Sequence, residues 1–550
     1  MTDQASISGG SRRPFTATPA RAQFLAILGV LLAVIAIAYP SLFVPFGRDQ
    51  GIHANIAKLV QDGLVVYRDI FNVKPPMTTV IHWLSQRLFG ETVQAIRLMD
   101  IVIIAAACVM LQLLVSRHLK SAWLGVVAAI AYACFHFSNG YWSSAQTDGW
   151  CGFFTIAAML AYSHALDRED ARGRLWLLAL AGFAIGLSFW LKYTSALVKL
   201  VIPAVHLAMG AKIRRILRVG AAVTAGLLLC ICGGIAVLAA QGALVAFLDI
   251  QDFMRSYVAH GQSILRIALW PFFKLAGAKM AAILAMLGTY AVFKSIQRRK
   301  QVPECIGLLV WLAAGCASGM LQGKLFTYHM LPFHPPLAVA AAVGVSALVA
   351  FLGRRTKHHV KIPIALCASL LIVWFSEIPK KYNQVLPLLR GEQSLRAFWD
   401  IEEFNHFDFK TTHNMALVDY LRRETLACDT VYLWGFEPGV YFKADRRPVT
   451  RFTFNFPMFS AFYRQSYRDE FMADLRAAPP VAFIVEHDDR TPHVSIHNKD
   501  SAEVLEEFGE LKAFLSDRFI YRERVTRFDV YFRNDVAGGD TRSCPPSPAS

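Results

Sequence analysis

The amino-acid sequence predicts an α-helical protein that crosses a membrane many times and carries a small α/β domain at its C-terminal end. Of its 550 residues, 55% are hydrophobic and only 17% are charged, and the mean hydropathy is +0.39. The apolar residues gather in long uncharged runs, and the basic residues gather in the short loops between these runs. This distribution is unusual for a soluble protein and typical of a polytopic membrane protein.

About eleven apolar segments are candidates for transmembrane helices. The first, Phe24–Phe43, has no charged residue and is long enough for a hydrocarbon core of about 30 Å at about 1.5 Å per residue. The others are Ile96–Val115, Ala122–Phe137, Trp150–Ala165, Leu175–Leu191, Tyr193–Met209, Val219–Ala240, Leu269–Phe293, Cys305–Leu321, Met330–Leu352 and Ile362–Phe375.

The basic loops predict the orientation of the chain. They contain Arg12, Arg13 and Arg21; Arg117 and Lys120; Arg168, Arg172 and Arg174; Lys212, Arg214, Arg215 and Arg218; Lys294, Arg298, Arg299 and Lys300; and Arg354, Arg355, Lys357 and Lys361. With eleven spans, all of them face one side, and the positive-inside rule makes that side the cytoplasm. Residues 1–23 are then a disordered cytoplasmic tail, and the net charge of +16 reflects topology, not nucleic-acid binding. We expect a multi-pass protein of the cell inner membrane.

The composition changes after the last span, so residues 24–375 are expected to form the membrane domain and residues 376–534 an α/β domain in the periplasm. The expected helices are Asn414–Thr425, Ala461–Ala478 and Ala502–Ser516, and the expected strands are Thr430–Trp434, Val481–Glu486 and a hairpin within Phe519–Phe532. Residues 535–550 are expected to be a disordered tail. Most of the ten cysteines lie in apolar runs without a CxxC pair, so no disulfide framework is expected.

The first outer loop, residues 44–95, contains two segments with the spacing of amphipathic helices. One has Ile52, Ile56, Leu59 and Val60 on one face, and the other has Met77, Ile81, Leu84 and Leu88. Because both follow a membrane span, we expect them to lie in the membrane interface with one face in lipid.

Charged residues of this loop have two interpretations each. Asp49 follows the first span directly and is either a functional acid or an interfacial acid paired with Arg48. Lys74 precedes two prolines, which keep its backbone extended, so it is suited either to binding a phosphate or to reaching lipid headgroups.

Four further candidates lie at the outer ends of later spans. Asp148 is either a functional acid or a residue that stabilises a helix N-terminus. Lys192, between two apolar runs, has the same two interpretations as Lys74. Tyr328 and His329 precede another span, and no metal-ligand spacing accompanies this histidine.

Together these motifs resemble the GT-C glycosyltransferases, in particular the family of protein O-mannosyltransferases and bacterial lipid A aminoarabinose transferases. The motifs are Asp49 after the first span, G-x-x-x-Y-R-D from Gly63 to Asp69 with Tyr67 and Arg68, Lys74-Pro75-Pro76, Arg97-Leu98, and Y-H-x-x-x-x-x-P-P from Tyr328-His329. The resemblance covers roughly residues 24–350. The family often has Asp-Glu where this chain has Asp49-Gln50.

The resemblance implies a membrane enzyme that takes a sugar from a polyprenyl-phosphate carrier on the outer face. Asp49 then occupies the position of the catalytic acid, Lys74 that of the carrier-phosphate ligand and Asp148 that of the second acid. The expected reaction is inverting, with Asp49 as general base and with Arg68 and Lys192 assisting Lys74. Tyr67, Tyr328 and His329 complete the expected substrate-binding set.

The expected partners are a polyprenyl-phosphate-linked sugar, membrane lipids and a lipid, polysaccharide or protein acceptor, with no nucleic acid. No cofactor is assigned, and a role for a divalent metal stays open. The alternative function is a transporter or flippase of a lipid-linked envelope precursor, although the charges cluster at one membrane face and not near the midplane. A phosphotransferase would favour a nucleophilic Ser or Thr or a metal cluster, and the sequence shows neither.

Overall fold

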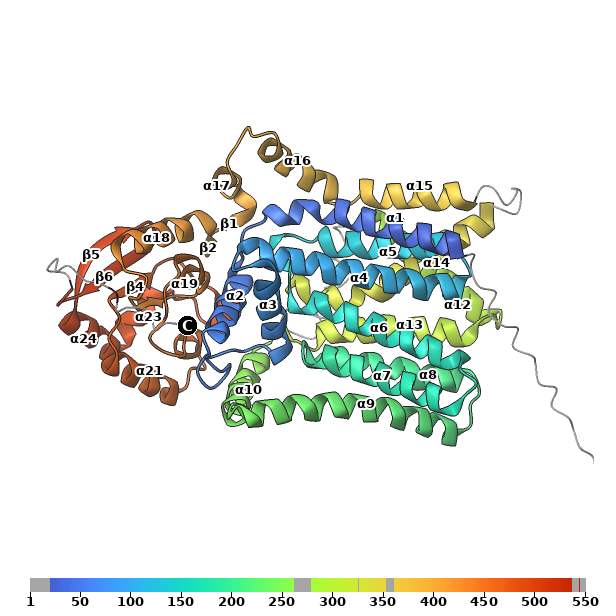
Figure 1. Cartoon of the computed structure of the whole chain (residues 1–550), viewed down its shortest axis with the longest axis horizontal. Helices are drawn as coiled ribbons and strands as arrows, with labels where there is room; N and C mark the ends of the chain where they lie inside the picture. Colours follow the sequence, from blue (N-terminus) through green and yellow to red (C-terminus); the bar gives the residue numbers. More distant parts are fainter. Residues whose placement is uncertain (1–19, 262–277, 325, 353–360, 537–543, 545–550) are drawn as a thin grey trace, which may run out of the picture.

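The computed structural model describes residues 20–261, 278–324, 326–352, 361–536 and 544. A bundle of long helices occupies one end of the molecule, and a mixed α/β domain occupies the other (Figure 1). Between them lie α2 (Arg48–Gln61), α3 (Pro76–Phe89) and α10 (Leu244–Ala259).

Within the described residues, eight helices are long and apolar enough to cross a membrane. They are α1 (Ala20–Ala38) with η1 (Tyr39–Phe43), α4 (Val93–Leu119), α6 (Thr147–Asp167), α7 (Ala171–Phe189), α9 (Ile213–Ala240), α12 (Lys279–Gln297), α13 (Val302–Met320), and η5 (Thr327–Phe333) with α14 (His334–Leu352). Three shorter apolar elements are α5 (Ala122–Phe137), η3 (Tyr193–Leu200) with α8 (Val201–Ala208), and α15 (Lys361–Trp374). The predicted polytopic helical fold is confirmed, although residues 269–277 of one predicted span lie outside the described part.

Glycines allow two helix pairs of the bundle to approach closely. A Cβ atom on Gly182 of α7 would lie 1.9 Å from the carbonyl oxygen of Val223 in α9. A Cβ atom on Gly288 of α12 would lie 1.8 Å from the carbonyl oxygen of Ala340 in α14. Small residues at such crossings are typical of membrane helix pairs, where close backbone packing replaces the hydrophobic effect.

The helix α2 does not present its apolar face to lipid, in contrast to the prediction, because that face is buried in the protein. Nearly all of its residues are buried, including polar residues such as Gln50 and Asn55. The reason is that α3 packs on one side of α2 and α19 (Gly439–Ala444) of the C-terminal domain packs on the other. Gly51 approaches that domain so closely that a Cβ atom on it would lie 2.9 Å from the Cα atom of Gly439.

The helix α3 exposes part of the predicted apolar face. Leu84 and Leu88 are exposed together with Val80, whereas Ile81 of the predicted face is buried against the protein. Its polar residues, including His82 and Gln86, are buried against the protein. An apolar stripe outside and a polar stripe inside is the arrangement expected of a helix at a lipid boundary.

The C-terminal region begins with α16 (Ile378–Leu389), α17 (Leu395–Phe398), η7 (Glu402–Phe404) and a two-stranded sheet of β1 (Asn405–His406) and β2 (Phe409–Lys410). A four-stranded sheet follows with the order β3-β4-β6-β5. Its strands are β3 (Val431–Trp434), β4 (Ala482–Glu486), β5 (Phe519–Val525) and β6 (Phe528–Arg533). The first two are parallel, whereas β4 pairs antiparallel with β6, and β5 and β6 form the predicted hairpin.

Helices cover both faces of this sheet. One face packs on α18 (Thr411–Glu424) and α19, and the other on α21 (Gln465–Ala477), α23 (Ser501–Glu507) and α24 (Gly509–Arg518). The strands β3 and β4 are therefore buried throughout, which explains their continuous apolar sequences. The predicted helix Ala502–Ser516 is divided in two at Phe508.

A disulfide bond joins Cys428, just before β3, to Cys544. The expectation of a wholly disordered tail is therefore wrong at Cys544, and the other residues after position 536 lie outside the described part. Neither cysteine belongs to an apolar run, in contrast to buried thiols such as Cys108 and Cys134. Disulfide bonds persist in oxidising compartments and are rare in the cytosol.

Candidate active site

A cavity of about 1320 Å³ lies where the helix bundle meets the C-terminal domain. Its walls come from α2, the loop before α3, the loop before α6, α9, α10, the segment before η5, and the C-terminal domain. One part of the wall is polar and carries Asp49, Lys74 and Lys192. Another part is apolar and includes Ile235 of α9 and Leu248 of α10. The cavity therefore suits a ligand with both a charged and an apolar part.

Asp49 lies in the first turn of α2, and its side chain borders the cavity. The helix begins after Gly47, whose backbone N–H donates to Oε1 of Gln50 at 2.9 Å. Nε2 of Gln146 donates to Oδ2 of Asp49 at 3.2 Å, and the Tyr328 side chain also interacts with Asp49. Among the described residues Asp49 forms no ion pair, and Arg48 pairs with other carboxylates. The interpretation of Asp49 as the ion-pair partner of Arg48 is therefore not supported.

Lys74 is held in place through its backbone. Its N–H donates to Oδ1 of Asn72 at 3.0 Å, and its carbonyl accepts from the Tyr67 hydroxyl at 2.8 Å. Pro75 then begins the turn into α3. The Lys74 ammonium lies 5.6 Å from the centre of the Tyr328 ring and is available to a ligand in the cavity.

Asp148 lies behind the cavity wall. It is completely buried, and its Oδ2 lies 3.4 Å from Nζ of Lys192. Its Oδ1 accepts from Nε2 of Gln322 at 2.8 Å. Lys192 and Gln322 do border the cavity, so Asp148 holds two cavity residues and is not itself in the lining.

Tyr328 and His329 also border the cavity, as expected for substrate-binding residues. Nδ1 of His329 lies 3.0 Å from the carbonyl oxygen of Lys324, which fixes the imidazole against its own loop. The structure thus brings five predicted residues to one cavity from four separate stretches of sequence. These are Asp49, Lys74, Lys192, Tyr328 and His329.

Tyr67 and Arg68 do not reach the cavity, in contrast to the prediction. Tyr67 is buried in the core beside Phe247 and acts on Lys74 only through its hydroxyl. Arg68 is exposed, pairs with Asp69 at 2.8 Å and donates to the carbonyl oxygen of Gln241 at 3.1 Å. The positive φ of Tyr67, 71°, turns the chain so that these neighbours point in different directions.

Three residues that the sequence analysis did not select also line the cavity. His53 lies one turn after Asp49 on α2, and burial together with the charge of Lys74 lowers its pKa to about 3, so its imidazole is neutral. Lys324 lies 4.1 Å from the centre of the Tyr257 ring, and burial lowers its pKa. The i, i+4 spacing from Asp49 is a signal for His53, whereas Tyr257, on α10, lies near no other candidate in the sequence.

Within the part of the chain that the structure describes, no group of three or more His, Cys, Asp or Glu side chains is arranged to hold a metal ion. The polar groups of the cavity are instead two carboxylates, several cations and neutral hydrogen-bonding side chains. Of the two carboxylates, Asp408 pairs with Arg48, whereas Asp49 has no ion-pair partner among the described residues. Such a set can remove a proton from a hydroxyl and stabilise an anionic leaving group.

The chain is similar in sequence to known proteins over part of its length. Residues 73–239 match the model of the family described as dolichyl-phosphate-mannose-protein mannosyltransferase. The undecaprenyl phosphate-alpha-4-amino-4-deoxy-L-arabinose arabinosyl transferase of Pseudomonas aeruginosa LESB58 is 28% identical over 259 residues, which are 46% of each chain. The enzyme of the same name from Yersinia pestis Pestoides F is 25% identical over 337 residues, 58% of each chain. The chain thus spans about half the length of these relatives.

Solved structures show the same fold. ArnT from Cupriavidus metallidurans, bound to undecaprenyl phosphate, has a TM-score of 0.58 at 14% identity and covers 95% of this chain and 100% of its own. The oligosaccharyltransferase from Archaeoglobus fulgidus, in its apo form, has a TM-score of 0.52 at 12% identity and covers 84% of this chain and 69% of its own. The resemblance to GT-C glycosyltransferases that the sequence predicts is confirmed, and the chain has their polytopic membrane fold.

Proposed function

We propose that this chain, which has the GT-C fold, transfers a sugar from a polyprenyl-phosphate carrier to an acceptor hydroxyl with inversion at the anomeric carbon. The observation that carries the proposal is the cavity itself. It combines a carboxylate without an ion-pair partner among the described residues, Asp49, with the lysines Lys74 and Lys192 and with an apolar wall. The family match and the names of the relatives support this class of donor.

In the proposed mechanism, Asp49 acts as general base. It takes the proton from the acceptor hydroxyl as the oxygen attacks the anomeric carbon from the face opposite the phosphate. The bond between that carbon and the phosphate oxygen breaks, and the carrier phosphate leaves. Gln146 and Tyr328 keep the Asp49 carboxylate in place.

Lys74 binds the departing phosphate and stabilises its negative charge. Its fixed backbone places the base of the side chain at the cavity, so the ammonium reaches a bound phosphate without rearrangement of the loop. Lys192 contributes a second positive charge, and Asp148 is a positioning residue that holds it. The apolar wall from α9 and α10 accommodates the carrier's hydrocarbon chain.

We also propose that the N-terminus is cytoplasmic, that residues 24–375 form the catalytic membrane domain and that residues 376–534 lie outside. The alternating basic loops support this orientation. The bond between Cys428 and Cys544 supports it independently, because disulfide bonds persist in oxidising compartments such as the periplasm and are rare in the cytosol. The acceptor is then a lipid, a polysaccharide or a protein at the outer face. A transporter or flippase is less well supported, because the family and the relatives named above are transferases.

The test is sugar transfer by the purified protein in lipid nanodiscs. Synthetic undecaprenyl-phosphate donors carrying a hexose or an aminopentose are incubated with cell-envelope extract as acceptor, and free undecaprenyl phosphate is measured. Asp49→Asn keeps the size of the side chain but removes its basicity, so the rate should fall by about 10²–10⁴-fold.

Asp62→Asn is the matched control. Asp62 follows the last turn of the same helix and pairs with Arg447 at the surface, 3.0 Å away. Such a partly exposed pair contributes at most about 1 kcal/mol, so this variant should transfer at close to the wild-type rate. A wild-type rate for Asp49→Asn, or equal loss in both variants, would show that Asp49 is not the base.

A further inference from the structure

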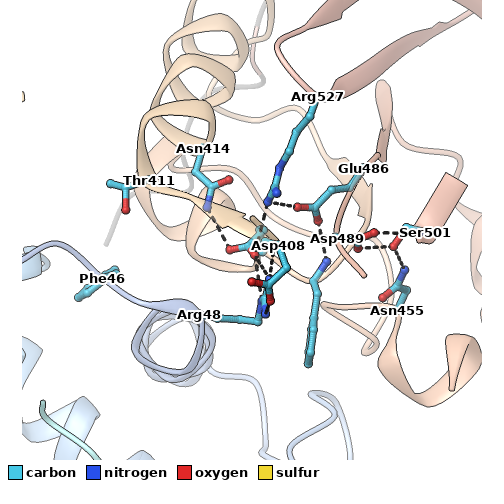
Figure 2. Close-up of polar contacts among 12 residues, drawn as sticks. Phe46, Arg48, Asp408, Thr411, Asn414, Asn455, Glu486, Asp489, Ser501 and Arg527 are labelled. Carbon is cyan, nitrogen blue, oxygen red and sulfur yellow. Dashed lines mark hydrogen bonds and ion pairs between the residues drawn. The ribbon is translucent and has the colours of Figure 1, made fainter. Parts of the chain in front are cut away.

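A cluster of buried charges connects the C-terminal domain to the residue next to Asp49 (Figure 2). Arg48 is only 8% exposed, and its Nε donates to Oε1 of Glu437 at 2.9 Å. Its two Nη atoms contact Asp408, one at 3.1 Å to the carboxylate and the other at 2.8 Å to the carbonyl oxygen. These three hydrogen bonds of a membrane-domain arginine therefore all go to the C-terminal domain.

Further contacts close the cluster into a network. Asn414 donates to Glu437 at 3.0 Å, Arg527 pairs with Glu486, and Glu486 accepts from the backbone N–H of Phe436 at 2.9 Å. The Phe436 ring in turn lies 5.0 Å from the Arg48 guanidinium. Glu486 thus holds the loop between β3 and α19 through the backbone of Phe436, and the ring of Phe436 contacts Arg48.

Arg48 and Asp49 are consecutive residues of one helix, so their side chains leave the helix axis about 100° apart. Fixing the direction of Arg48 therefore fixes the rotation of α2 and with it the direction of Asp49. Other contacts hold the helix start from the membrane side, because Nε2 of Gln50 donates to the carbonyl oxygen of Ser144 at 2.6 Å. The start of α2 is held between the two domains.

We propose that Arg48 is a positioning residue for Asp49 and that the C-terminal domain completes the active site by holding Arg48 through Glu437 and Asp408. The inference rests on the proposed function, since it assigns a role relative to Asp49. Arg48 also borders the cavity, but its charge is already balanced by two carboxylates. It is therefore poorly suited to bind the carrier phosphate itself.

The first measurement separates positioning from substrate binding. Arg48→Met should lower kcat by about 100-fold, the loss typical of a reacting group displaced by about 1 Å, with little change in the KM for the donor. Arg48→Lys keeps the charge but not the forked geometry, so it should recover only part of the rate. A rise in KM at constant kcat would show that Arg48 binds substrate and would overturn the proposal.

The second measurement separates positioning from folding. Arg48→Met leaves the buried charge of Glu437 with only the more distant Arg527, 3.8 Å away, so the variant should be less stable. Adding Glu437→Gln removes that poorly compensated charge and keeps the hydrogen bond from Asn414, so the melting temperature should recover while kcat stays low. Recovery of kcat together with stability would show a purely structural role.

Hydrogen exchange gives a readout that needs no substrate. In Arg48→Met, amides of the first turns of α2 should exchange faster, whereas those of β4 should stay protected. Lys58→Met is the control, because Lys58 also connects α2 to this domain, through Asp445, but three turns away from Asp49. It should leave exchange at Asp49 and kcat unchanged.

These readouts keep the two proposals apart. An inactive wild-type protein would refute the transferase assignment, and the exchange experiment would still decide whether Arg48 holds the start of α2. Unchanged exchange at the start of α2 in Arg48→Met, together with a wild-type kcat, would overturn the positioning role.

Discussion

The helices α2 and α3 share a length of 14 residues and the same amphipathic spacing, yet their surroundings are opposite. In α3 the apolar residues Leu84 and Leu88 face outward with Val80, and Ile81 and the polar stripe pack on the protein. In α2 the apolar stripe joins the core that the C-terminal domain shares with the loop, and the polar stripe is buried as well. The comparison teaches that the spacing identifies a helix with two different faces but does not identify what covers each face.

The residue types on the polar side of a helix indicate in part whether protein or water covers that side. The polar side of α2 carries Arg48, Gln50 and Asn55, which can make several directed hydrogen bonds in an interior. A helix that presents its polar side to water more often carries flexible lysines and glutamates. Three predictions, from the largest expected effect to the smallest, test how far the two helices differ.

The largest effect is expected at the apolar stripes. Ile56 of α2 is completely buried, so Ile56→Ala should lower the free energy of unfolding by about 2–5 kcal/mol, the cost of a cavity in a packed core. Leu88 of α3 is 61% exposed, and Leu88→Ala should change it by less than about 0.5 kcal/mol. Melting temperatures in the same detergent give the comparison. Equal destabilisation by both variants would mean that the apolar face of α2 is no more buried than that of α3.

The next effect concerns the loop between the two helices. Lys74→Ala removes one charge-assisted contact to phosphate, typically about 1.5–3 kcal/mol, so kcat/KM for the carrier donor should fall roughly tenfold to a hundredfold. Lys74→Arg should retain part of the activity. Arg68→Ala is the control from the same loop, because Arg68 points away from the cavity. An unchanged Lys74→Ala variant would mean that Lys74 contacts only lipid headgroups.

The smallest effect concerns the pH dependence of the domain that covers α2. Burial raises the pKa of Glu486 to about 7, although Arg527 opposes the shift. Because this pKa is raised above the unfolded value of about 4.5, the native state holds the extra proton and stability falls as the pH rises through 7. Between pH 6 and 8 the loss should be about 1 kcal/mol.

Hydrogen exchange at α2 and α3 over this pH range provides the measurement. Exchange at α2 should increase with pH beyond the intrinsic chemical rate, and exchange at α3 should not. Glu486→Gln should reduce the pH dependence, and Asp489→Asn tests the neighbouring carboxyl, whose pKa burial also raises to about 7. A pH dependence that persists in both variants would assign it to another group.

Much of the fold follows from local sequence patterns. All eleven apolar segments correspond to apolar helical elements over the described residues, and the strand pair of the C-terminal hairpin was predicted because alternation and turn signals lie within a few residues of each other. The residues Asp49, Lys192, Tyr328 and His329 can be predicted because each lies at the end of an apolar run, and Lys74 because it precedes two prolines.

The Arg48 network and the disulfide bond cannot be predicted from the sequence, because both depend on contacts between distant parts of the chain. The partners of Arg48 lie 360 and 389 residues away, and Cys428 and Cys544 are separated by 116 residues. No short-range pattern marks such pairs. The position of Arg68 is predicted wrongly for a local reason. Its motif suggests a place in the cavity, but the positive φ of Tyr67 turns Arg68 away from it.

The close approach of Gly51 and Gly439 has a consequence for building chimeras. A Cβ atom on Gly51 would lie 2.9 Å from the Cα atom of Gly439, and one on Gly439 would lie 3.1 Å from the Cα atom of Gly51, so a side chain at either position requires the opposite surface to shift. The C-terminal domain is therefore not an exchangeable module. A hybrid that takes this domain from a relative must therefore take α2 from the same parent. In such a hybrid, residues 48–61 and the segment from residue 405 onward are exchanged together.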